Sequence, residues 1–257
     1  MLQILAEDHE LLMVVSIILF FTTVAFGITW VFTVVQKRPM IQRFDGVVPT
    51  FLGLPSVLFS LTVALMATSI WENYSLANKS VRSESIALGT IVELAETEPS
   101  LKKGPLALYA KNYARSVIED EWQTLSTRGV HAAVTKKHFD LLRQTTFEAV
   151  DSLDNNAQAR TLMNAIQTVN EARKTRLSFV SFDIHPVRWY ASIILAVLVL
   201  LVVACIHVSK PKVLPFVMGI STVTILLPMC TIAITLSNPY VGLISISNSP
   251  FKAVLLN

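Results

Sequence analysis

The chain has 257 residues, of which 53% are hydrophobic and only 15% are charged. This balance is too apolar for an ordinary soluble domain and indicates an integral membrane protein. The formal net charge of +3 is small, and the basic residues lie mostly in a charge-balanced middle segment, so we predict no nucleic-acid partner.

Four apolar runs follow one another along the chain, and each is close to the ~20 residues that cross a bilayer as a helix. They cover residues 11–35, 51–70, 189–208 and 213–236. The first run follows acidic rather than basic residues and is too long for the apolar part of a signal peptide, so we predict that it is retained. The runs form two hairpins on either side of a polar insert.

Apolar residues at helical spacing continue through this insert and predict a bundle of four helices. The first continues the second apolar run, without a proline, as far as Pro99. The others carry apolar stripes within residues 106–122, 139–153 and 162–169, and each stripe needs a partner that covers it. We therefore predict an all-α integral membrane protein with four transmembrane helices in two hairpins. Its domains are a first hairpin at 1–71, a helical-bundle insert at 72–187, and a second hairpin with a C-terminal tail at 188–257.

Basic residues in the short turns of both hairpins predict the orientation. The first turn holds Lys37, Arg38 and Arg43, the second holds Lys210 and Lys212, and acidic residues precede the first run. The positive-inside rule places both turns in the cytoplasm, which puts the insert and both termini outside. We predict a multi-pass protein of the inner or plasma membrane, with the lipid bilayer as its first partner.

The interiors of the four spans contain no Asp, Glu, Lys or Arg, which counts against an ion-coupled transporter. No convergent acid, base, nucleophile or metal set accompanies them, so we predict neither enzyme activity nor a cofactor. His131 and His138 lack the further ligands of a metal site, and no metal is predicted. The acidic residues 119–121 are interpreted as a solvated face. The many hydroxyl side chains in the spans serve either helix packing or the lining of a pore.

The second span carries two distinct faces. Ser56, Ser60 and Ala64 recur at every fourth residue and form a small-residue ridge that allows another helix to approach closely. A different face, which we call the leucine face, consists of Leu54, Leu58, Leu61 and Leu65. In a monomer this face would meet lipid or the core of a bundle, whereas in a ring of subunits it would form a hydrophobic constriction that gates by dewetting. Spacing alone leaves both alternatives open.

Short motifs flank the second span on both sides. A Pro, a Leu and a Gly stand at positions 49, 52 and 53, and an exit motif follows that consists of Trp71, Glu72, Asn73 and Tyr74. Together with the order of two membrane helices, a helical insert and two more membrane helices, these motifs resemble bestrophins. More closely, the whole chain resembles the bacterial bestrophin-like family of unknown function, to which residues 109–122, 170–177 and 238–240 are also similar.

Bestrophins are homopentameric ion channels whose second membrane helices surround the pore and supply an apolar neck. The resemblance therefore implies a homo-oligomer, a pentamer, that conducts small ions passively. The positions that correspond to the pore neck are Leu54, Val57, Leu58, Leu61 and Leu65. Calcium gating is not predicted, because the acidic calcium clasp of animal bestrophins has no match after the last span. Bestrophins keep the insert in the cytosol, which is opposite to the side that the basic turns predict.

A membrane sensor is the alternative hypothesis. Its extracytoplasmic helical bundle would detect a ligand and transmit a helix shift across the membrane. This function requires a partner protein, because we identify no cytoplasmic output domain in the chain. The oligomeric state discriminates between the two hypotheses, since four helices without charged interiors leave little room for a water-filled path within one subunit.

Overall fold

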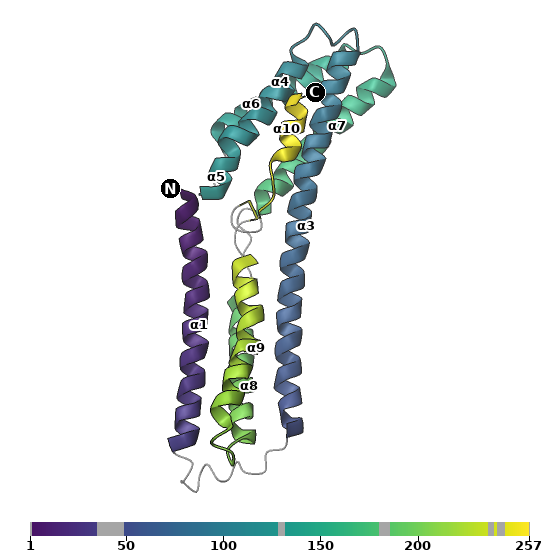
Figure 1. The fold of residues 1–257 in the computed structure, drawn as a ribbon. Helices are drawn as coiled ribbons and strands as arrows, with labels where there is room; N and C mark the ends of the chain where they lie inside the picture. The colour runs from purple at the N-terminus through teal and green to yellow at the C-terminus, as the bar shows by residue number, and fades with distance from the viewer. Residues whose placement is uncertain are drawn as a thin grey trace. The chain divides into compact units, whose positions relative to one another are not determined.

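A computed structural model of the protein describes residues 2–34, 49–127, 132–179, 186–235, 239–240 and 245–256. Every regular element within these ranges is helical, which confirms the predicted all-α class. In chain order the elements are α1 (Leu2–Val34), the short 3₁₀ helix η1 (Pro49–Leu52), α3 (Gly53–Thr97), α4 (Leu106–Ser116), the π-helical η2 (Val117–Glu121), α5 (Trp122–Thr127), α6 (Ala133–Asp151), α7 (Asn156–Ser178), α8 (Pro186–Ile206), α9 (Leu214–Thr235) and α10 (Ser249–Leu256) (Figure 1).

Four segments are long and apolar enough to cross a membrane, as predicted. They are Leu11–Val34, Thr50–Thr97, Pro186–Ile206 and Leu214–Thr235. The second is the longest because α3 does not end with its apolar run. With no proline between Gly53 and Thr97 beyond the first turn, the helix continues into the polar insert.

The chain divides into two compact units. The membrane unit comprises Glu7–Trp71 and Asp183–Ser237. The insert unit comprises Met1–Ala6, Glu72–Phe182 and Asn238–Asn257, so it includes the C-terminal tail that the sequence analysis grouped with the second hairpin. Helix α3 contributes its first part to the membrane unit and its second part to the insert unit.

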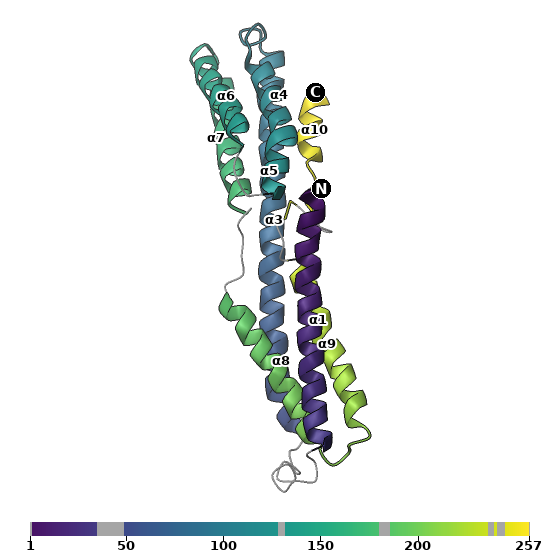
Figure 2. The ribbon, with the colours of Figure 1, turned by 90° about the vertical axis from the view of Figure 1, so that its left-hand side faces the viewer.

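Within the membrane unit, α8 lies beside α3 (Figures 1 and 2), and side-chain contacts join the two helices. Phe59, Val63 and Met66 are buried at the spacing of one helical face. The Oγ atom of Ser192 on α8 lies 3.2 Å from the Sδ atom of Met66. One turn further along, Arg188 Nη1 donates a hydrogen bond of 3.2 Å to the hydroxyl of Ser69. These contacts fix which side of α3 faces its own chain.

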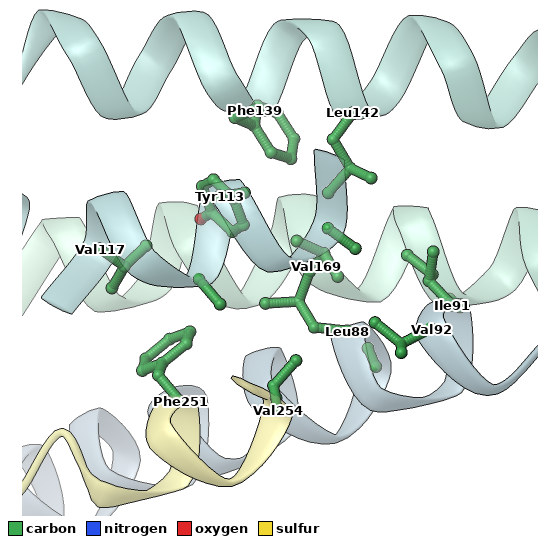
Figure 3. Packing of buried hydrophobic residues seen from close by; sticks show 14 of the residues in the cluster. Leu88, Ile91, Val92, Tyr113, Val117, Phe139, Leu142, Val169, Phe251 and Val254 are labelled. Atoms are coloured by element: carbon green, nitrogen blue, oxygen red, sulfur yellow. The ribbon is translucent and has the colours of Figure 1, made fainter. Parts of the chain in front are cut away.

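The insert unit surrounds one apolar core, which the second part of α3 shares with α4, η2, α6, α7 and α10. Side chains from these helices point toward one another in Figure 3. Those labelled there are Leu88, Ile91, Val92, Tyr113, Val117, Phe139, Leu142, Val169, Phe251 and Val254. The helices that we predicted from apolar stripes in the insert are confirmed. Helix α10 was not predicted. It contributes Phe251 and Val254 to the core and packs beside α4.

Candidate functional site

The membrane part of α3 presents the predicted neck residues on the side opposite its contact with α8. These side chains are between 44% and 66% exposed, and none is covered by the described parts of the chain. They are Leu54, Val57, Leu58, Leu61 and Leu65. The same helix buries Phe59, Val63 and Met66, so the exposure reflects which face points outward and not a general lack of packing. The leucine face is therefore available to lipid, to a pore or to another subunit.

The small-residue ridge lies on a third side of α3. Ser60 and Ala64 are exposed and Ser56 is half-buried, so the ridge does not make the contact with α8. The hydroxyl of Ser60 donates to the carbonyl oxygen of Ser56 at 2.8 Å, which satisfies it within the helix. The ridge stays available for close approach by another molecule, a use that small residues favour in membranes.

The exit motif spans the division between the two units. Trp71 and Glu72 are exposed, whereas Asn73 and Tyr74 are half-buried. Tyr74 packs against the core of the insert unit. All four residues belong to α3, so the motif marks the point at which one helix passes from the membrane unit to the insert unit.

A group of buried charged side chains, which we call the charged cluster, lies in the insert unit and joins three helical elements. Arg176 of α7 is fully buried between Glu84 of α3 and Glu121 of η2. Its Nε donates to Glu84 Oε2 at 2.7 Å, and its Nη2 donates to Glu84 Oε1 at 3.2 Å and to Glu121 Oε2 at 2.7 Å. Charge-assisted bonds of this kind are among the strongest in proteins and fix the geometry of both partners.

Neighbouring groups complete the cluster. Arg173 Nη2 donates to the second oxygen of Glu121 at 2.7 Å, and the Tyr113 hydroxyl donates to Glu84. Two arginines therefore balance two glutamates. Two buried nitrogens, Nε of Arg173 and Nη1 of Arg176, have no hydrogen-bond partner within the described part of the chain.

The C-terminal tail covers one side of this cluster. The hydroxyl of Tyr240 donates to the backbone carbonyl of Arg176 at 2.8 Å. The ring of Phe251 on α10 lies 5.7 Å from the Arg176 guanidinium carbon, within the range of a cation–π contact. Trp122 packs edge-on against both Tyr240 and Phe251. The tail is thereby held by the same arginine that binds the two glutamates.

The electrostatics of the cluster favour a structural role. Burial raises the pKa of Tyr113 well above its ordinary value, and the negative charge of Glu84 adds to the shift. Burial alone would lower the pKa of Arg176, but the carboxylates of Glu84 and Glu121 outweigh it and raise that pKa. Both groups keep their protons at neutral pH, which suits a cluster that fixes the helices.

The interpretation of residues 119–121 as a solvated face was wrong for one of the three. Glu119 and Asp120 are exposed, but Glu121 is fully buried. A helix turns its successive side chains in different directions, so consecutive acidic residues need not share an environment. The π-helical turn from Val117 to Glu121 directs the last carboxylate inward, toward Arg173 and Arg176.

The sequence contains a signal for this cluster that the predictions above did not include. Each charged member continues an apolar stripe at helical spacing, where a solvated residue is not expected. Glu84 lies between Val81 and Leu88, and Glu121 follows Val117 by one turn. The same pattern holds on α7, whose stripe continues through Arg173 and Arg176.

Some predictions fall on residues that the structure does not describe. They include His131 and the basic residues Lys37, Arg38 and Arg43 of the first turn. Within the described residues, no group of three or more His, Cys, Asp or Glu side chains is arranged to hold a metal ion.

The helices define the class first: this is an all-α, multi-pass membrane protein with a helical insert between its second and third spans. A bestrophin-like domain matches residues 19–251, and the chain therefore belongs to the bestrophin-like family, as its motifs predicted.

Solved structures share the fold. A single-residue variant of a bacterial bestrophin homolog from Klebsiella pneumoniae has 12% sequence identity and a TM-score of 0.69, over 95% of this chain and 96% of that chain. Another structure of a bestrophin homolog from the same organism has 10% identity and a TM-score of 0.66, over 94% and 95%. A crystal structure described as a membrane protein has 11% identity and a TM-score of 0.68, over 95% and 96%. No curated protein matches the sequence significantly. At these identities the likeness concerns the fold.

Proposed function

We propose that this protein is a homo-oligomeric, pentameric channel that conducts small ions passively through a pore lined by the membrane part of α3. The observation that carries the proposal is the outward position of the leucine face and Val57, opposite the side of α3 that packs on α8. Exposure alone suits lipid as well as a pore. Membership of the bestrophin-like family favours the pore.

The neck would act by excluding water. A ring of leucine side chains around a narrow axis leaves no polar group to replace the hydration shell of an ion, so water and ions pass only when the ring widens. Leu58 and Leu61 lie at the middle of the leucine face and are the principal neck residues. The ridge of Ser56, Ser60 and Ala64, which lies beside the leucine face, would pack against the neighbouring copy.

Ion flux from liposomes tests the neck. Leu58→Ala and Leu61→Ala should raise the flux above that of the wild type, because a smaller side chain widens the ring and lowers the barrier to wetting. Leu198→Ala on α8 is the matched control, since Leu198 is 43% exposed and Leu58 is 44% exposed. It should leave the flux unchanged. The absence of flux from the wild type and from both neck variants, over a range of pH and ions, would contradict the proposal.

The oligomeric state is an independent test. The mass of the purified protein in detergent should exceed that of a dimer and correspond to five chains. A strictly monomeric protein would have no site for the pore, because the four membrane helices of one chain carry no charged side chain in their interiors.

We further propose that the insert is extracytoplasmic, on the basis of Lys210 and Lys212 in the turn between α8 and α9. Two variants place a thiol on opposite sides of the membrane, Lys137→Cys on the exposed surface of α6 and Lys210→Cys in the turn. An impermeant thiol reagent on intact cells should label only Lys137→Cys, with the wild type as background. Labelling of Lys210→Cys alone would place the insert in the cytosol.

The sensor is the second candidate, and the observation that favours it is the continuity of α3 from Gly53 to Thr97. One helix that serves both units can transmit a shift from one to the other. A sensor predicts no flux from any variant, together with a ligand that binds the insert unit. Measured flux that responds to Leu58→Ala but not to Leu198→Ala decides for the channel.

A further inference from the structure

A groove runs between α1 and α9 on the surface of the membrane unit. It encloses about 530 Å³ and is lined almost entirely by apolar atoms. Residues that line it include Thr22, Trp30, Thr33, Pro215, Gly219 and Thr222. A carbon atom added at Gly219 would meet nothing within 4 Å, so the groove is open at that point.

The threonines of the groove do not make it polar. The hydroxyls of Thr22, Thr29 and Thr33 donate to carbonyl oxygens one turn earlier on α1, at 2.6, 2.7 and 2.8 Å. Thr222 on α9 does the same with Met218, at 2.7 Å. Since these donors are satisfied within their own helices, the groove offers little to an ion or a polar molecule. Its chemistry suits a hydrocarbon chain.

The length of the groove matches one leaflet of a bilayer. The lining residues of α1 extend from Thr22 to Thr33, and those of α9 extend from Pro215 to Leu226. At ~1.5 Å per residue, each wall is about 16 Å long. This is close to half of the ~30 Å of hydrocarbon in a membrane.

One end of the groove carries positive charge. Helix α9 begins at Leu214, directly after a turn that holds Lys210 and Lys212, both exposed. Neither lysine forms an ion pair with the part of the chain that the structure describes. Trp30 lines this same end, and indole rings prefer the level of the lipid headgroups. The leaflet-long apolar groove thus ends near a turn that carries two exposed lysines.

We infer that the groove between α1 and α9 binds an anionic phospholipid, with an acyl chain along the groove and its phosphate headgroup at Lys210 and Lys212. Juxtamembrane basic residues attract anionic lipid by about 1 kcal/mol each, which for two lysines is about a thirtyfold preference over a zwitterionic lipid. This site is separate from the leucine face on α3 and does not depend on conduction.

Lipid retention measured by native mass spectrometry tests the site. Delipidated protein in detergent is titrated with phosphatidylglycerol or with phosphatidylcholine of the same acyl chains. The wild type should retain phosphatidylglycerol about thirtyfold better at low ionic strength. Lys210→Gln with Lys212→Gln should abolish this preference. Gly219→Trp, which fills the groove, should lower the retention of both lipids.

Matched controls separate the site from general lipid contact. Ile220→Trp places the same indole on an exposed neighbouring position of α9 that does not line the groove, and it should retain lipid as the wild type does. Lys136→Gln with Lys137→Gln removes two exposed charges from the insert unit and should keep the preference. If Gly219→Trp fails to fold, the smaller Gly219→Leu takes its place.

Three results would overturn the inference. One is equal retention of the two lipids by the wild type. Another is that the Lys210/Lys212 variant keeps the same lipid preference as the Lys136/Lys137 control and that Gly219→Trp retains as much lipid as Ile220→Trp. The third is a loss of oligomeric mass on filling the groove, which would make it a contact between copies of the chain.

Discussion

The two units of this protein bury their side chains in opposite ways. The insert unit encloses an apolar core and even three charged side chains, Glu84, Glu121 and Arg176, within one chain. Each of the four candidate membrane spans has a most apolar stretch, and only 11% to 33% of that stretch is buried inside the chain. The insert unit is therefore completed by its own residues, whereas the membrane unit leaves most of its apolar surface to be covered by other molecules. Conduction and lipid binding are both proposed for the membrane unit, where the chain does not cover its own apolar surface.

The difference follows from the two solvents. In water, exposed apolar surface is unfavourable, and a helix of the insert unit is stable only when its stripe is covered. In lipid there is no such drive between helices, and a narrow strip of close contacts is enough. The contact through Met66 and Ser192 is a strip of this kind.

The largest effect on the insert unit is expected from Arg176→Met. The change leaves Glu84 and Glu121 buried without their shared positive charge and should lower the free energy of unfolding by about 3–5 kcal/mol. Denaturant unfolding in detergent measures the loss, and hydrogen exchange assigns it to the insert unit. Arg115→Met, at an exposed position of α4, is the control and should change stability by less than about 0.5 kcal/mol.

A second set of variants asks whether the loss comes from uncompensated charge. Replacing Glu84 by Gln in the Arg176→Met background should recover part of the stability, because Glu84 is then no longer an unpaired buried carboxylate while Glu121 keeps its ion pair with Arg173. A double variant that is no more stable than Arg176→Met would mean that Arg176 acts through packing alone.

The membership of the C-terminal tail in the insert unit is tested by Phe251→Ala. Phe251 is fully buried against Trp122 and the Arg176 guanidinium, and its truncation should cost about 3–5 kcal/mol. The matched control is Leu256→Ala on the same helix, since Leu256 is almost fully exposed. Equal stability of the two variants would mean that α10 does not belong to this core.

In the membrane unit, neighbouring residues of α3 should respond differently. Met66 is fully buried, and Met66→Ala should destabilise the unit by about 2–5 kcal/mol. Leu65→Ala removes a side chain that is exposed within the chain and should leave monomer stability nearly unchanged. The comparison requires refolding from a denaturing detergent at protein concentrations too low for assembly. A large loss for Leu65→Ala under these conditions would show that the leucine face is covered by its own chain.

A smaller effect, confined to high pH, is expected from Tyr113. Because burial raises its pKa in the folded state, the unfolded chain loses this proton first as the pH rises above about 10. The stabilising contribution is complete below that pH, and the free energy of unfolding falls above it. Tyr113→Phe should make the fall less steep, and Tyr240, whose pKa is also raised by burial, accounts for part of what remains. An unchanged slope in Tyr113→Phe would contradict the assignment.

Much of the fold follows from the sequence because its signals are repetitive. Long apolar runs and stripes at helical spacing predict the four spans and the helices from α3 to α7, and short motifs such as Trp71 to Tyr74 indicate the family. The charged cluster did not follow, because its central pair joins Glu84 and Arg176, which are 92 residues apart. Helix α10 was missed because its eight residues are too few for a clear period.

The leucine face shows a limit of a different kind. The sequence separates it from the small-residue ridge, but it did not predict the side of α3 that contacts α8, and one chain contains no information about how many copies surround an axis. Leu61 meets lipid in one arrangement and ions in another, and both leave it exposed within the chain. Its role depends on the assembly.

Thiol block of ion flux in liposomes tests the central claim most directly. Leu61→Cys places a reactive group at the proposed neck, and Leu198→Cys places one on an exposed surface of α8. With the wild type as background for the native Cys205 and Cys230, a charged thiol reagent should reduce flux through Leu61→Cys and leave Leu198→Cys unaffected. If the reagent modifies the introduced thiol of Leu61→Cys and the ion flux stays unchanged, this result would contradict a pore lined by α3.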